Sequence, residues 1–279
     1  MPRGRVATPR KVHRMPKAHK SRSGGAKLAP DTPRATPLPI ASGTLELIDE
    51  ADGSVTVYVN GVPSSSLNTD PDVLDFEYMR HEAAAIKAWD ATRADHAWLA
   101  LHVGAAACTL PRHLAHVHQS SRHIAVDIDL ALAEYARRWW DLPRAPRLRI
   151  REEDGLVALS RREAATLDLV VRDAFAGDTT PTHLAGASWW GHAKRVLRPG
   201  GLVVANVAVR PQDRSSWDDA TAAASAFGGL LAIGEHAVLK RKRRGNVVLV
   251  TGADDQVMSA LKRYAASAPL PTGVVANWS

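Results

Sequence analysis

Short apolar runs alternate with helical segments through the middle of the chain, and this alternation constrains the fold more than any other feature. The runs that we expect to form strands are AWLALHV, HIAVDID, RLRIREED, LDLVVRDAF and GLVVANVAV. Segments with helical spacing, such as LALAEYARRWW, separate them. Strands that alternate with helices of this length form a parallel sheet with helices on both faces. The sequence therefore predicts an α/β fold.

The regions on either side of this pattern suggest how the chain is divided. Residues 41–74 alternate apolar and polar side chains around Asp52-Gly53, which predicts a small β-hairpin element. Residues 75–258 begin with the helical segment DFEYMRHEAAAIKAWDA and form the expected main domain. Near its end, HAVLKRKR and GNVVLVTG are predicted to form an antiparallel hairpin on the sheet edge. Residues 259–279 are expected to form a C-terminal extension.

The first 40 residues carry most of the positive charge. Residues 1–40 hold ten Lys/Arg and one acid, a net charge of +9, so the rest of the chain contributes −2 to the total of +7. This segment is rich in Pro, Gly and Ser, which predicts a disordered basic tail. Such a tail can bind nucleic acid through phosphates. A solvated extension is the preferred interpretation, because no aromatic side chain interleaves the charges.

The composition indicates in which cellular compartment the protein is expected and which disulfide and metal sites are disfavoured. The single cysteine, Cys108, excludes an internal disulfide framework and disfavours a cysteine zinc site. His113, His116 and His118 lack a neighbouring carboxylate, so we expect no metal. No apolar run is long enough to span a membrane, and the first residues lack the apolar core of a secretory signal. A cytoplasmic protein is the expectation.

In open α/β sheets, ligands bind beyond the carboxyl ends of the strands. After the first strand, Gly104 and Ala105 begin a loop of small residues through which a ligand can approach the backbone. Asp127 follows 23 positions later, at the end of the second strand. An acid at about this spacing accepts hydrogen bonds from ribose hydroxyls in folds that bind nucleotides. We therefore predict a nucleotide site here, although a tight turn and an exposed acid are also common structural features.

Two further acids follow the next strands. Asp154-Gly155 is either a plain turn or a contact for the exocyclic amine of adenine. Asp173 ends the fourth strand, where a carboxylate can orient an amine nucleophile and accept its proton. A structural helix cap is the alternative for Asp173, although Asp178 is the better cap candidate because a Pro-containing helix start follows it.

The order of these motifs resembles the spermidine synthase (polyamine aminopropyltransferase) family over about residues 43–253. The segments that carry the resemblance are VYVNGVP, LDFEYMR, HVGAAACTLPR, AVDID, EEDG, VVRDAF, TPTHL, LRPGGLVVANV and GNVVLV. Several of them also occur in class I S-adenosylmethionine-dependent methyltransferases. The resemblance implies a Rossmann-like, mostly parallel sheet of seven strands behind a small β element, often in a homodimer.

The resemblance also implies roles for individual residues. The co-substrate would be decarboxylated S-adenosylmethionine, and the acceptor would be an amine. Asp127 would hold the ribose and Asp154 the adenine, while Tyr78 would line the acceptor side and Asp173 would be the catalytic base. Gly104, Ala105 and Gly155 would shape the donor site.

The chain departs from the family pattern at charged positions. No acid occurs between Leu101 and Ser121, where the family loop carries an Asp for the donor amine. Ala176 stands where a second acid would bind a diamine, and Asn60-Gly61 leads to Ser64 instead of a Gln. Three hypotheses follow: an aminopropyl transferase, a methyltransferase using S-adenosylmethionine with Arg112 near its carboxylate, and a non-catalytic nucleotide-binding homologue.

Overall fold

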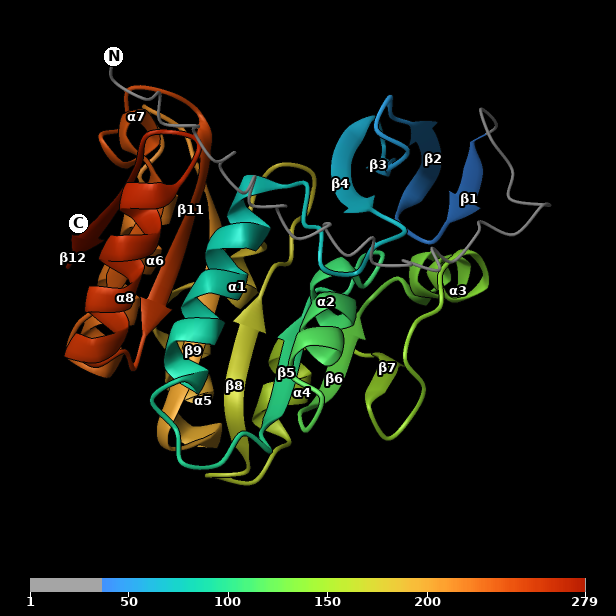
Figure 1. Ribbon diagram of the computed structural model, residues 1–279. Coiled ribbons are helices and arrows are strands. Elements are labelled where there is room, and N and C mark those ends of the chain that lie inside the picture. The colour runs from blue at the N-terminus through green and yellow to red at the C-terminus, as the bar shows by residue number, and fades with distance from the viewer. Residues whose placement is uncertain (1–36, 279) are drawn as a thin grey trace, which may run out of the picture.

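The computed structural model describes residues 37–278 as two β-sheets with their helices (Figure 1). Most of the expected basic tail, and with it the predictions of disorder and nucleic-acid binding, lies outside the described residues. The end of that segment, Leu38–Ile40, forms strand β1. Within the described part, no helix is long and apolar enough to cross a membrane.

The N-terminal β element is a small antiparallel sheet with the strand order β1-β2-β3-β4. Its strands are β1 (Leu38–Ile40), β2 (Gly43–Asp49), β3 (Val55–Val59) and β4 (Val62–Leu67). Asn60 and Gly61 join β3 to β4 with φ angles of 52° and 75°. Positive φ at both turn positions matches the twist of a two-residue hairpin, which explains the Asn-Gly pair. The sheet therefore has four strands, and the hairpin expected around Asp52-Gly53 is formed by β2 and β3.

The large sheet is mostly parallel and confirms the expected α/β class. Its strand order is β12-β10-β11-β9-β8-β5-β6-β7. The strands from β9 to β7 pair in parallel, and β11, β10 and β12 add antiparallel to them. Their bounds are β5 (Leu99–Val103), β6 (Arg122–Asp127), β7 (Leu148–Glu152), β8 (Leu167–Arg172), β9 (Leu197–Val209), β10 (Leu231–Glu235), β11 (Gly245–Thr251) and β12 (Thr272–Ala276).

Two details of this sheet differ from expectation. It has eight strands instead of seven, because β12 near the C-terminus pairs with β10. The first strand of the expected hairpin is β10 and not HAVLKRKR, since His236–Leu239 form the short helix α7. β11 then lies between β10 and β9 instead of at the edge. Helix α8 (Asp255–Ser267) spans the expected boundary at residue 258.

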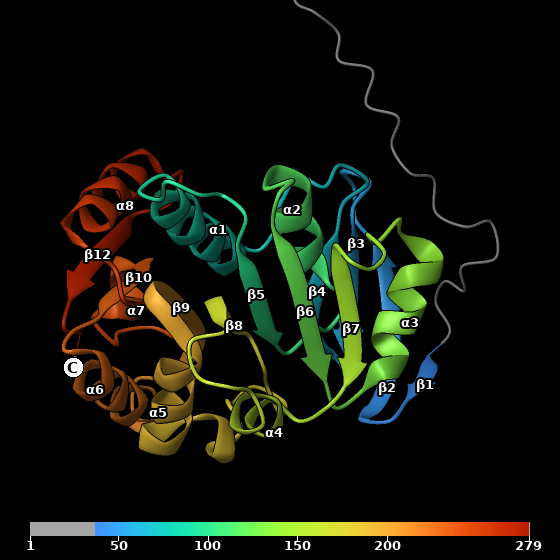
Figure 2. The ribbon, with the colours of Figure 1, turned by 90° about the horizontal axis from the view of Figure 1, so that it is seen from below.

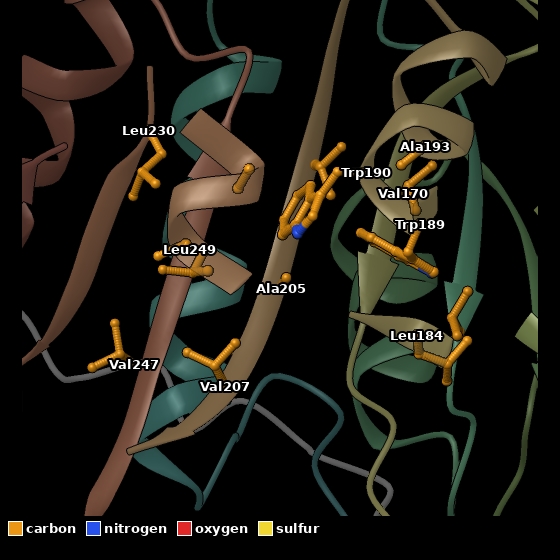
Figure 3. Packing of buried hydrophobic residues seen from close by; sticks show 14 of the residues in the cluster. Val170, Leu184, Trp189, Trp190, Ala193, Ala205, Val207, Leu230, Val247 and Leu249 are labelled. Atoms are coloured by element: carbon orange, nitrogen blue, oxygen red, sulfur yellow. The ribbon is translucent and has the colours of Figure 1, made fainter. Parts of the chain in front are cut away.

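Helices cover both faces of the large sheet, as the view along it shows (Figure 2). One face carries α1, α2 and α8, and the other carries α4, α5 and α6, whereas α3 packs beside the small sheet. Trp189 and Trp190 are fully buried, with Trp190 beside Ala205 of β9 and Trp189 near Val170 of β8 and Leu184 (Figure 3). The other helices are α1 (Glu77–Asp90), α2 (Thr109–Val117), α3 (Leu130–Trp139), α4 (Gly155–Ser160), α5 (Gly186–Val196), α6 (Ser215–Phe227) and the 3-10 helix η1 (Thr182–Leu184).

The direction of the strand order reverses between β5 and β8. The chain runs from β5 outward through β6 to β7, then returns to place β8 on the other side of β5. At such a point the loops that follow the two strands diverge and leave a crevice. Gly104 follows β5 and Asp173 follows β8, and the amide of Asp173 bonds the carbonyl of Val103 at 2.9 Å. The fold thus brings these two predicted site residues together.

Candidate functional site

A pocket of about 300 Å³ opens at this crevice. Its walls are the loops after β5, β6, β7 and β8, together with residues of the small sheet such as Ile40 and Ser42. The predicted site residues on its wall are Tyr78, Gly104, Asp127, Asp154, Gly155 and Asp173. Ala105 is buried behind them and contributes its amide. The pocket therefore gathers the carboxylates that the sequence placed at separate strand ends.

The loop after β5 wraps around the side chain of Asp127. The amides of Ala105 and Ala106 donate to Asp127 Oδ2 at 2.8 and 3.1 Å. The amide of Asp129 donates to Asp127 Oδ1 at 2.9 Å. A carboxylate accepts about four hydrogen bonds, so Asp127 retains accepting capacity toward the pocket while it fixes the loop.

Gly104 is required by close packing. Its φ is +90°, and a Cβ at this position would lie 2.2 Å from the carbonyl oxygen of Asp173. Only glycine fits both the backbone conformation and the contact. Gly104 thereby holds the loop after β5 against the start of the loop after β8.

Asp154 is the N-cap of α4. Its Oδ1 accepts from the amides of Leu156 and Val157 at 2.9 and 3.0 Å, a capping arrangement typical of Asp. Its Oδ2 lies 2.7 Å from His183 Nε2, and the Val157 amide and His183 help to lower its pKa against the opposing effect of burial. A Cβ at Gly155 would lie 2.2 Å from Val103, so this glycine lets α4 approach β5. The turn and the cap are thus present in the same motif that was predicted to contact adenine.

A chain of side-chain hydrogen bonds forms the other end of the pocket. Tyr78 Oη donates to Asp173 Oδ2 at 3.1 Å, and Asn206 Nδ2 donates to Asp173 Oδ1 at 2.8 Å. Asn246 Nδ2 donates in turn to Asn206 Oδ1 at 2.9 Å. The four residues come from α1, the end of β8, β9 and β11. Both oxygens of Asp173 are therefore oriented by donors from other elements.

Burial shifts the pKa values in this chain. Desolvation raises the pKa of Asp173 to about 6, although the bonds from Asn206 and Tyr78 oppose the shift. Burial and the charge of Asp173 raise the pKa of Tyr78 well above its usual range, so its hydroxyl remains a donor. A carboxylate with a pKa near 6 is close to the operating pH and is suited to general-base chemistry.

Glu82 lies one helical turn beyond Tyr78 on α1 and is fully buried. Within the described residues, neither of its carboxyl oxygens has a hydrogen-bond partner. Burial and then the charge of Asp173 raise its pKa well above the ordinary range. Burial therefore favours the neutral, protonated form of Glu82.

Acidic side chains dominate the pocket wall. Among the described residues that line it, there is no Lys or Arg, and His183 is the only basic side chain. The six carboxylates on the wall are Asp127, Asp129, Glu153, Asp154, Asp173 and Asp178. A wall of this charge attracts and stabilises cationic ligands.

Sequence reasoning missed Asn206, Asn246 and Ser42. Asn206 is 1% exposed and is the polar side chain within the otherwise apolar segment GLVVANVAV, a signal that was available. Ser42 binds Asp129 Oδ2 through its amide at 2.6 Å and its Oγ at 2.7 Å, which ties the small sheet to α3. No local pattern indicates that contact, because the two residues are 87 positions apart.

The predictions for Asp178 as a helix cap and for Arg112 near the donor site were wrong. Asp178 caps no helix, because its carboxylate binds Arg210 and Arg244. Arg112 donates to the carbonyls of Asn68 and Thr69 and does not line the pocket. Within residues 37–278, no group of three His, Cys, Asp or Glu side chains is arranged to hold a metal ion.

Comparisons with solved structures identify similar proteins. A probable spermidine synthase from Corynebacterium glutamicum is 31% identical, with a TM-score of 0.80 over 87% of this chain and 91% of that one. A spermidine synthase from Thermotoga maritima shares the fold at 15% identity and a TM-score of 0.56, over 83% of this chain and 78% of the other. Human methyltransferase-like protein 13, solved with SAH, shares it at 19% identity and a TM-score of 0.51, over 68% and 93% of the two chains. No protein-family profile and no curated protein matches the sequence.

Proposed function

Because the chain belongs to the spermidine synthase family, we propose that it transfers an aminopropyl group from decarboxylated S-adenosylmethionine to an amine. The adenosine part of the donor would occupy the donor half of the pocket, which we define as Gly104, Ala105, Asp127, Asp154 and Gly155. The amine would occupy the acceptor half, defined as Tyr78, Asp173, Asn206 and Asn246. The reacting carbon would lie between the two halves, beside Asp173.

The observation that carries this proposal is the charge of the pocket wall. Among the described residues, six carboxylates and no Lys or Arg line the pocket, and four of the six (Asp127, Asp129, Asp154 and Asp173) have no arginine partner, unlike Glu153 and Asp178. The decarboxylated donor carries a sulfonium and an ammonium group and no anionic group. Both of its charges are therefore opposite in sign to the carboxylates of the pocket wall. S-adenosylmethionine has an additional carboxylate, which a cation or backbone amides must satisfy. Arg112 is engaged elsewhere, so the wall favours the decarboxylated donor over the methyl donor.

Asp173 would act as the base in the transfer. The acceptor ammonium first gives a proton to Asp173, and the unprotonated nitrogen then attacks the aminopropyl carbon attached to sulfur, in line with the C–S bond. A C–N bond forms, the C–S bond breaks, and its electron pair stays on sulfur to give methylthioadenosine. Asp173 thus accepts the proton that the acceptor loses before the attack, and its raised pKa supports this role. Tyr78 and Asn206 would keep its two oxygens in position.

Calorimetric titration with three nucleosides tests the donor. We expect decarboxylated S-adenosylmethionine to bind at least about tenfold more tightly than S-adenosylmethionine, a difference of about 1.4 kcal/mol. Methylthioadenosine is expected to bind in the same pocket. Tighter binding of S-adenosylmethionine would favour methyl transfer. Binding of none of the three would leave a non-catalytic homologue as the better hypothesis.

A further inference from the structure

The acceptor half offers a ligand one carboxylate and then neutral amides. Asp173 is followed by Asn206, whose Nδ2 is bonded to Asp173 and whose Oδ1 is bonded to Asn246. Asn206 is buried, and both polar atoms of its side chain already take part in hydrogen bonds. Asn246 is only partly buried and lines the pocket. The polar chain therefore ends in an amide group, which carries no net charge.

The next carboxylate along this side of the pocket is neutralised. Asp178 lies on the pocket wall, and its two oxygens face Arg210 and Arg244, the latter at 2.7 Å. The bond from Arg210 is the main cause of the lowered pKa of Asp178. Arg210 also lies 3.9 Å from Asp213, at the edge of a normal ion pair. The intervening residues Ala176 and Gly177 contribute no charge.

The two ends of an acceptor would therefore meet different charges in this half of the pocket. An ammonium beside Asp173 meets a carboxylate with free accepting capacity. A second ammonium farther along would meet either the amide of Asn246 or a carboxylate already paired with two guanidinium groups. To reach Asp178 it would have to displace an arginine and would then lie close to it. Like charges brought together in this way oppose binding.

We propose that the acceptor is a primary amine with a single cationic end, whose far end is an uncharged or anionic group. This inference rests on the proposed aminopropyl transfer and specifies its substrate class. An uncharged far end, such as a hydroxyl, hydrogen-bonds the Asn246 amide. An anionic far end would pair with Arg244, whose side chain is 68% exposed and lies 2.7 Å from Asp178 of the pocket wall.

Four acceptors of matched chain length test this inference: 4-amino-1-butanol, 4-aminobutanoate, n-butylamine and 1,4-diaminobutane. The readout is methylthioadenosine released from decarboxylated S-adenosylmethionine. We expect kcat/KM for the amino alcohol or the amino acid to exceed that for the diamine at least about tenfold, which is about 1.4 kcal/mol. If kcat/KM for the diamine equals or exceeds that for both the amino alcohol and the amino acid, this inference is wrong, whereas the proposed aminopropyl transfer is still supported. No release with any of the four overturns the proposed function and this inference with it.

Substitution of the amide provides a second test. Asn246→Asp places a carboxylate at the end of the polar chain with almost unchanged volume, and we expect it to raise kcat/KM for the diamine relative to the amino alcohol at least fivefold, about 1 kcal/mol. Gln256→Glu adds the same charge on the exposed surface of α8 and should leave the ratio unchanged.

Arg244→Gln covers the possibility that Asn246→Asp does not fold. It removes one partner of Asp178 from an exposed position and should shift the ratio toward the diamine. Thermal unfolding of each variant reports folding. An unchanged ratio in every folded variant contradicts the assigned roles of Asn246 and Asp178.

Discussion

The two halves of the pocket are built in different ways. In the donor half, Asp127 binds backbone amides of the loop after β5, and Asp154 binds amides in the first turn of α4 together with the side chain of His183. In the acceptor half, Asp173 is bound by side chains from α1 and β9, which are 95 and 33 residues away in sequence. Hydrogen bonds to backbone amides persist when the neighbouring side chains change. A chain of hydrogen bonds between side chains, such as that of the acceptor half, is altered by a single substitution. Under the proposed function, we expect the donor half to keep a shared co-substrate and the acceptor half to be where specificity diverges.

The largest effect is expected for Asp173→Asn, which removes the proposed base without changing the size of the side chain. We expect kcat to fall by about 10²- to 10⁴-fold, the usual contribution of a general base. Methylthioadenosine should bind with its Kd changed by less than about threefold, below 1 kcal/mol. Rapid-quench turnover and calorimetry measure the two quantities. Asp255→Asn on the exposed surface of α8 is the control. Full activity in Asp173→Asn would remove the distinction between the halves.

Gly104→Ala should damage both halves at once, because this glycine joins them. The new Cβ would lie 2.2 Å from the Asp173 carbonyl oxygen at a φ of +90°. Backbone strain of this kind costs about 1–3 kcal/mol, and we expect lower thermal stability together with weaker donor binding and slower turnover. Gly53→Ala is a matched control, with φ of +85° and no heavy atom within 4 Å of its Cβ. Equal behaviour of the two variants would show that the contact has no role.

Asp127→Ala should affect the donor half alone. It removes the acceptor for the amides of Ala105 and Ala106 and the proposed ribose contact. Hydrogen bonds to a charged group contribute about 1.5–3 kcal/mol each, so we expect donor Kd to rise by about 10- to 100-fold. With saturating donor, kcat should remain within about threefold, a change below 1 kcal/mol. A large fall in kcat with unchanged Kd would contradict the assignment.

Tyr78→Phe tests the hydrogen bonding of Asp173 in the acceptor half through the pH dependence of kcat/KM. The base must be ionised to act, so activity rises with pH through the pKa of Asp173, which is about 6. The Tyr78 hydrogen bond stabilises the carboxylate and lowers this pKa. Its loss should move the acid limb of the kcat/KM profile to higher pH, with kcat reduced by less than about tenfold, or 1.4 kcal/mol. A shift to lower pH would exclude this role for the hydroxyl.

Glu82→Gln is expected to have the smallest effect. Burial raises the pKa of Glu82 and so favours its protonated form, and glutamine is neutral and nearly the same size. We expect kcat within about twofold and the free energy of unfolding within about 1 kcal/mol of the parent value. A tenfold loss of kcat would mean that Glu82 exchanges a proton during turnover and belongs to the acceptor half.

The same contrast explains how much the sequence predicted. The parallel sheet and the positions of Asp127, Asp154 and Asp173 follow from apolar runs and from the residue after each run, both of which are local signals. Asn206 and Asn246 were missed because their meaning depends on β9 and β11 being neighbours, which no local pattern specifies. HAVLKRKR was misassigned because its short apolar run precedes the turn residues Arg244-Gly245, whereas the structure uses the preceding LAIGE segment, which is more buried.

The position of β11 between β9 and β10 has a consequence during synthesis on the ribosome. The chain emerges from its N-terminus, so every residue of the donor half is available before Asn206, and Asn246 follows last among the pocket residues. A nascent chain that ends before Gly245 carries every residue of the donor half but leaves β9 without β11 beside it, an open edge prone to pairing with other chains. Of the described pocket residues, premature termination there would remove only Asn246, the residue at the end of the polar chain in the acceptor half.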